Sequence, residues 1–265
     1  MSAIVRHGRA QAAGPLGRAA TATAWGLAAW GVAQLAGAFL GRLPLALGMA
    51  QAAIAEWCAG RIGITWSDPA RPAPTAAAVA RRVGQGAALG AGAAVLTAAA
   101  ALAARGASLV RAEGGALVDP SGSLAAIGLL ACVVAAMRDE LLLRGVALKV
   151  TRGLLPDWAS LLACGAVAAA ARFGVAGAVD ASLVGHALRA VALGGLWIRD
   201  RGVWVAWAAN AAWMWTVGPL ARGGLVDLRF VAEPDAAVTT WVVLSAAALA
   251  SAVVLRPRAE SRLSR

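Results

Sequence analysis

The sequence predicts an all-α protein: a polytopic membrane helical bundle of about eight transmembrane helices, with both termini on the cytoplasmic side. Two observations predict this class. The chain of 265 residues is 60% hydrophobic and only 14% charged, and its mean hydropathy is +0.72, whereas a typical soluble domain has about 25% charged residues. Several apolar runs also reach the roughly 20 residues that an α-helix needs to cross a bilayer.

Charged residues, Pro and Gly divide the apolar sequence into successive runs. We expect helices at about 19–41, 43–59, 84–104, 123–150, 157–178, 183–198, 203–218 and 237–255. The first run follows a basic stretch, as the apolar part of a signal peptide does. Because further spans follow it, we interpret it as a retained helix.

These runs predict five parts of the chain. They are a basic cytoplasmic arm at 1–18, two N-terminal helices within 19–66, a Pro/Ala-rich cytoplasmic linker at 67–83, a six-helix body at 84–256 and a basic tail at 257–265. The body opens with GQGAALG, at 84–90. Because no strand precedes these glycines, they indicate close packing of small residues between helices rather than a phosphate-binding loop.

The basic residues predict the orientation of the helices, because Lys and Arg favour cytoplasmic loops. Eight spans place five basic groups on one side: the N-terminal arginines, Arg71/Arg81/Arg82, Lys149/Arg152, Arg199/Arg201 and the C-terminal arginines. The mixed loops at 105–122 and 219–236 then lie outside, with Arg105 and Arg111 as exceptions to the rule.

The net charge of +11 suits contact with the anionic headgroups of membrane lipids. No zinc-finger spacing or recognition helix supports a nucleic-acid partner, so we expect lipids as partners and no nucleic acid. The Ala- and Arg-rich, Lys-poor composition fits a high-GC bacterial gene. We therefore expect a multi-pass protein of the bacterial inner (cytoplasmic) membrane.

One charged stretch, MRDELLLRG at 137–145, ends the apolar run from Ser123. On a helix, Glu140 and Arg144 are spaced i, i+4 and can form an ion pair, while Asp139 points about 100° away from Glu140. If no other charged residues followed in the chain, these charges could simply mark the cytoplasmic end of the helix. Lys149 lies beyond them and is better placed for that task, so we favour a functional role, as is usual for ionisable groups within membranes.

Three motifs resemble those of the CPBP intramembrane proteases, also called the CAAX-processing or bacteriocin-processing (Abi) family. DELLLRG resembles the family's Glu-Glu-x-x-x-Arg signature, and RFGVAG at 172–177 resembles Phe-x-x-x-His. The stretch ALGGLWIRDRGVWVAWAANAAWMW is similar to the family's Gly-rich helix, basic turn and final His-x-x-x-Asn helix. The motifs occur in family order over about 123–218. The resemblance implies an endopeptidase that acts at the membrane on CAAX-type or exported precursors, with a carboxylate-activated water.

The sequence departs from these motifs at four positions. Asp139 replaces the first glutamate, Gly177 and Asn210 stand at the two histidine positions, and Met214 stands at the asparagine position. Histidine is the usual proton carrier near neutral pH. Losing a proton relay lowers a rate by roughly 10²- to 10⁴-fold, so we expect low activity unless another group substitutes. By its motifs the chain resembles a degenerate member of the family.

The resemblance implies roles for five residues. Asp139 and Glu140 position or activate water, Arg144 orients the carboxylates, Asn210 binds the oxyanion, and Phe173 belongs to the substrate-binding second motif. No HExxH and no cluster of Cys and His ligands is present in the sequence, so we expect neither a metal nor another cofactor.

Two alternatives stay open. His186 is a candidate substitute for the missing histidines, because His7 is the only other histidine and lies in the basic arm. We favour the other interpretation, an interfacial histidine that bonds water or a carbonyl, because His186 lies near the end of its predicted helix. The whole chain is alternatively a catalytically inactive relative that binds a peptide or a partner protein. It would then keep Glu140 and Arg144 because an unpaired buried charge costs several kcal/mol.

Overall fold

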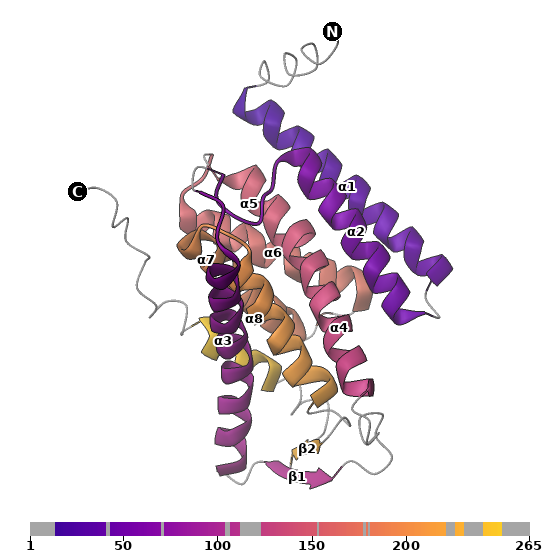
Figure 1. Cartoon of the computed structure of the whole chain (residues 1–265), viewed down its shortest axis with the longest axis vertical. Helices are drawn as coiled ribbons and strands as arrows, with labels where there is room; N and C mark the ends of the chain where they lie inside the picture. Colours follow the sequence, from indigo (N-terminus) through magenta and orange to yellow (C-terminus); the bar gives the residue numbers. More distant parts are fainter. Residues whose placement is uncertain are drawn as a thin grey trace, which may run out of the picture.

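A computed structural model gives the fold of the chain (Figure 1). The residues that it describes are 14–40, 43–69, 72–103, 107–111, 123–152, 154–176, 179, 181–220, 226–230 and 241–250. Most of the predicted basic arm, the predicted basic tail, His7 and Gly177 lie outside the described residues.

The described chain is built almost entirely of helices. They are α1 (Pro15–Leu40), α2 (Pro44–Ile62), α3 (Ala76–Ala103), α4 (Ser123–Arg138), α5 (Val146–Thr151), α6 (Asp157–Ala176), α7 (Ala181–Asp200) and α8 (Trp204–Trp215), followed by Trp241–Ala250. Two π-helices continue them: η1 (Asp139–Gly145) joins α4 to α5, and η2 (Thr216–Leu220) extends α8. With α4, η1 and α5 taken as one helix, the described residues confirm the predicted all-α class and its eight helices.

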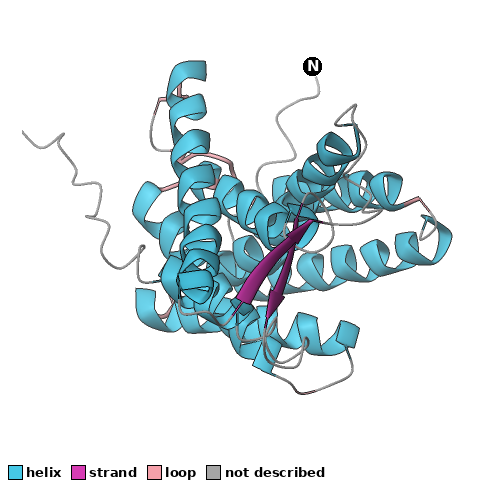
Figure 2. Cartoon of the chain, turned by 90° about the horizontal axis from the view of Figure 1, so that it is seen from below, coloured by secondary structure: helices cyan, strands magenta, loops and turns pink. Residues whose placement is uncertain are grey.

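Two local features differ from the expectation. Helix α3 begins at Ala76 rather than at residue 84, because the Thr75 hydroxyl accepts a hydrogen bond from the amide of Ala78 at 3.3 Å and an alanine-rich stretch follows. The two connections expected to be loops contain β1 (Ala107–Arg111) and β2 (Val226–Phe230), which pair antiparallel. Figures 1 and 2 place this small sheet at one end of the helices.

Helices α3 and α8 cross closely, and two glycines permit this. A Cβ at Gly86 would meet the Val205 carbonyl, and a Cβ at Gly90 would meet the Ala209 carbonyl. The two glycines are four residues apart and therefore share one helix face. The small-residue packing predicted from GQGAALG is confirmed.

Helices α1 and α2 lie side by side and pack against the helix that carries the charged motif. Helix α2 contacts α4, and α1 contacts α5 (Figure 1). Their interface with η1 is apolar, because Leu141 and Leu142 pack with Ala29 and Cys58. A second apolar cluster joins α7 and α8 through Leu193 and Val205, with further residues of α3.

Evidence for membrane crossing is strongest for α3. Within the described residues, Ala76–Ala100 is the helix long and apolar enough to span a bilayer by length and composition. Large apolar side chains also lie exposed on other helices, such as Phe39 on α1 and Leu162 on α6. The predicted number of transmembrane helices stays a prediction.

Candidate active site

The charged motif forms a buried π-helical turn inside a longer helix. In η1 the amide of Val146 donates to the carbonyl of Leu141, five residues earlier. Such π-turns are rare and frequently occur at functional sites. Asp139, Glu140 and Arg144 are all buried there, so the sequence correctly placed these charges on a helix but did not indicate its π geometry.

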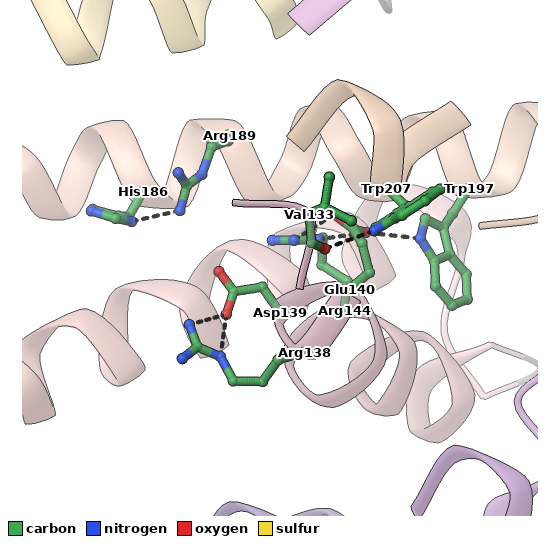
Figure 3. Close-up of polar contacts among 9 residues, drawn as sticks. All are labelled: Val133, Arg138, Asp139, Glu140, Arg144, His186, Arg189, Trp197 and Trp207. Carbon is green, nitrogen blue, oxygen red and sulfur yellow. Dashed lines mark hydrogen bonds and ion pairs between the residues drawn. The ribbon is translucent and has the colours of Figure 1, made fainter. Parts of the chain in front are cut away.

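Glu140 and Arg144 form the ion pair that their spacing predicts. Arg144 Nε donates to Glu140 Oε2 at 2.8 Å and Nη2 donates to Oε1 at 2.5 Å. The indole Nε1 of Trp197 on α7 donates to Oε2 at 2.9 Å (Figure 3). The side chains of Glu140 and Arg144 are only 0% and 1% exposed. Three N–H groups therefore hold this carboxylate in the interior.

Asp139 points away from that pair and is held by its neighbour in the sequence. Arg138 donates to Asp139 Oδ1 through Nε at 2.9 Å and Nη2 at 2.6 Å. The remaining Arg138 nitrogen, Nη1, donates to Gln51 Oε1 on α2 at 2.7 Å, and Gln51 Nε2 donates to the Ala33 carbonyl on α1 at 3.1 Å. Asp139 is thus connected to the α1–α2 pair.

One oxygen of Asp139 is open. Among the contacts of the described residues, Oδ2 makes no hydrogen bond, and Figure 3 shows it on the side of η1 that faces His186 and Arg189 of α7. The Asp139 residue is 6% exposed. The carboxylate is therefore fixed through one oxygen and available through the other.

Arg189 extends the charged site onto α7. The residue is 7% exposed, its guanidinium lies 4.6 Å from the centre of the Trp213 ring, and its Nη2 lies 3.0 Å from His186 Nδ1. The hydrogen bond drawn for His186 in Figure 3 is thus to Arg189, and a catalytic role for His186 stays a prediction.

Asn210 lies in the core of α8. It is fully buried, and neither its amide nitrogen nor its oxygen has a hydrogen-bond partner among the described residues. Buried amides are nearly always paired, so this side chain has unused donor and acceptor capacity. Trp207, one turn earlier, fixes α8 on α4 through a 3.0 Å hydrogen bond to the Val133 carbonyl.

The other positions singled out by the motifs are less central. Phe173 is 47% exposed near the end of α6, and its role in substrate binding stays a prediction. Met214 packs against the cluster around Trp213. No group of three or more His, Cys, Asp or Glu side chains that would hold a metal ion occurs in the described part of the chain.

A cavity of about 720 Å³ lies beside the charged motif, between the ends of α1, α2, α5 and α7. Gly145 and Trp197 line it together with several basic residues, while the predicted site residues do not. Trp197 therefore contacts both the cavity and Glu140.

Sequence reasoning missed three residues of the site: Gln51, Trp197 and Arg189. A signal existed for Gln51 and Arg189, because polar or charged residues within apolar runs need partners. Trp197 offered no such signal, because tryptophan is common in apolar helices.

Comparison with known proteins agrees with the motifs. Residues 121–216 match the family model described as "Rce1-like: Type II CAAX prenyl endopeptidase Rce1-like", and this segment holds every residue of the site except Gln51. No curated protein and no solved structure gives a significant match to the chain. The matched family is membrane-embedded. Residues 121–216, which are less than half of the 265-residue chain, are thus similar to the Rce1-like CAAX prenyl endopeptidase family.

Proposed function

We propose that the chain is a membrane endopeptidase that hydrolyses a peptide bond in a membrane-associated or lipidated peptide, with Asp139 as the carboxylate that activates water. The open Oδ2 of Asp139 carries this proposal. Arg138 holds the other oxygen through two hydrogen bonds, so the lone pairs of Oδ2 remain for a water molecule. A general base must have such an acceptor within hydrogen-bond reach of the proton that it takes.

Glu140 has a positioning role in this proposal. Its two oxygens already accept three N–H groups from Arg144 and Trp197, so it has little capacity left for water. The Glu140–Arg144 pair instead fixes η1 and thereby the direction of Asp139.

Asn210 would bind the oxyanion that forms when water attacks the peptide carbonyl. An oxyanion hole needs donors that are fixed in place before the reaction and are not used by other acceptors. The buried amide of Asn210 has this property.

The membrane setting belongs to the same proposal. We infer about eight transmembrane helices, cytoplasmic termini and a bacterial inner membrane, with lipids as surrounding partners. The basic groups at the helix ends and the exposed apolar side chains, such as Phe39 and Leu162, support it.

A second function is favoured by one specific observation. An asparagine stands where the family has a histidine, and asparagine carries no proton near neutral pH. The chain would then be an inactive relative that binds a peptide without cutting it. The same open Asp139 oxygen would accept a hydrogen bond from the peptide backbone.

Cleavage by the purified protein distinguishes these functions. The full chain in detergent is offered prenylated peptides and lipoprotein-precursor peptides, and cleavage is followed by mass spectrometry. We expect Asp139→Asn to lower the rate by about 10²- to 10⁴-fold, while Asp157→Asn, at an exposed aspartate of α6, changes nothing. Binding without cleavage by the wild type would favour the inactive relative, and equal cleavage by Asp139→Asn would exclude Asp139 as the base.

A further inference from the structure

Arg189 is a buried cation without a carboxylate in direct contact. The two carboxylates of the site are taken by other arginines: Asp139 by Arg138 and Glu140 by Arg144. Within the described residues, no carboxylate oxygen lies within 4.0 Å of Arg189, and its Nε has no hydrogen-bond partner. Its hydrogen-bonding capacity is therefore only partly used.

The charges of the site do not balance. Three arginines, Arg138, Arg144 and Arg189, face two carboxylates, Asp139 and Glu140 (Figure 3). One positive charge is left over, and Arg189 carries it. An uncompensated charge in the interior is costly unless an anion accompanies it, so the site is electrostatically suited to a bound negative charge.

Arg189 is also held in a fixed position. Its guanidinium stacks on the Trp213 ring at 4.6 Å and contacts His186 Nδ1 at 3.0 Å. Because a guanidinium only donates hydrogen bonds, Nδ1 must be the acceptor, and the His186 ring is neutral with its proton on Nε2. His186 is therefore a positioning residue for Arg189.

The position of Arg189 relative to Asp139 completes the geometry. Helix α7 contacts η1 and is tied to it by the hydrogen bond between Trp197 and Glu140. The open oxygen of Asp139 lies on the side of η1 that faces Arg189 (Figure 3). Asn210 is three residues before Trp213 on α8 and shares its helix face, and Arg189 of α7 lies over the Trp213 ring.

We propose that Arg189 binds the carbonyl oxygen of the scissile peptide and stabilises the negative charge that develops on it, in place of the family's missing histidines. This inference rests on the proposed hydrolysis. Asp139 removes a proton from water while the water oxygen bonds to the carbonyl carbon, and the carbonyl π electrons move to the oxygen that faces Arg189. The C=O bond then re-forms, the C–N bond breaks, and the amine leaves with the proton from Asp139.

The excess charge explains why this arrangement favours the transition state. The substrate amide is neutral, so it leaves the extra positive charge of the site uncompensated. The oxyanion compensates it and is bound more tightly. An interaction that strengthens only as charge develops accelerates the reaction itself rather than substrate binding.

The test compares the affinity of the protein for two probes, a peptide and its phosphonate analogue. The phosphonate is tetrahedral and anionic like the intermediate, and its binding does not depend on turnover. We expect the wild type to bind the phosphonate more tightly than the amide peptide and Arg189→Ala to lose this preference. We expect Arg189→Lys to keep part of it. Arg81→Ala, at an exposed arginine of α3, is the control and should keep it fully.

Kinetics supply the second arm. Arg189→Ala should lower kcat by about 10²- to 10³-fold, the loss typical of an oxyanion donor, with a much smaller change in KM. Added guanidinium ion should restore part of the rate in Arg189→Ala but none in Asp139→Asn. The inference would be overturned if the wild type showed no preference for the phosphonate or if Arg189→Ala kept that preference unchanged. It would also be overturned if guanidinium ion did not restore the rate of Arg189→Ala and Arg189→Lys were no more active than Arg189→Ala. A wild type that prefers the phosphonate but cuts no peptide would contradict only the proposed hydrolysis.

Discussion

Replacing Arg144 by methionine tests how strongly the buried ion pair holds η1. Glu140 is 0% exposed, and after the change only the Trp197 indole would remain to bond its carboxylate. Removing one partner of a buried pair costs about 3–5 kcal/mol, because the other charge is left unpaired in the interior. We therefore expect Arg144→Met to lower the free energy of unfolding by this amount.

The double variant Glu140→Leu/Arg144→Met removes both charges together. Apolar replacement of a buried pair is often neutral or stabilising, although the Trp197 N–H then loses its acceptor, at about 1–3 kcal/mol. We expect the double variant to be more stable than Arg144→Met alone. The difference reports the coupling between the two side chains.

The assay is reversible unfolding in mixed detergent micelles, followed by tryptophan fluorescence for the single and double variants. Arg81→Met is the matched control, because Arg81 is an exposed arginine of α3 and exposed charges contribute little to stability. A loss below about 1 kcal/mol for Arg144→Met, or a double variant no more stable than the single one, would refute this view of the pair.

Two further predictions concern packing around the site. Gly90→Ala places a methyl group against the Ala209 carbonyl and should lower the free energy of unfolding by about 1–3 kcal/mol as an overpacked contact. Gly92→Ala is its control and should not destabilise the protein, because a Cβ at Gly92 meets nothing within 4 Å. Equal melting temperatures of the two variants would contradict the close crossing of α3 and α8. Trp197→Phe removes one donor to the buried Glu140 carboxylate and should lower stability by about 1–3 kcal/mol. Trp158→Phe, at a residue that is 67% exposed, is its control in the same unfolding assay, and the same loss in both would rule out a special role for the Trp197 N–H.

Much of the fold was predictable because it depends on local pattern. Apolar runs broken by charge and Pro predicted most helices within a few residues, as for Asp157–Ala176 against the expected 157–178, whereas α3 begins well before the expected residue 84. The pairing of Glu140 with Arg144 followed from spacing within one helix, and GQGAALG indicated the close crossing of α3. The small sheet was missed because β1 and β2 are short and about 115 residues apart in the chain.

The candidate site was only partly predictable, for a physical reason. Helical periodicity tells which residues share a face of one helix, whereas the site is built between helices. Gln51 reaches Arg138 across 87 residues of sequence, and Trp197 reaches Glu140 across 57. The proposed role of Arg189 could not be predicted from its own helix either, because that role depends on the charged residues of η1.

Cleavage of a peptide in ¹⁸O-labelled water tests the role of Asp139 most directly. The newly formed carboxyl group of the product is analysed by mass spectrometry for the wild type and for Asp139→Asn. We predict that the wild-type product carries one ¹⁸O atom from water and that Asp139→Asn forms it at least about 10²-fold more slowly. Product formed at the same rate by Asp139→Asn, or wild-type product without the label, would contradict the assignment of Asp139 as the carboxylate that activates water.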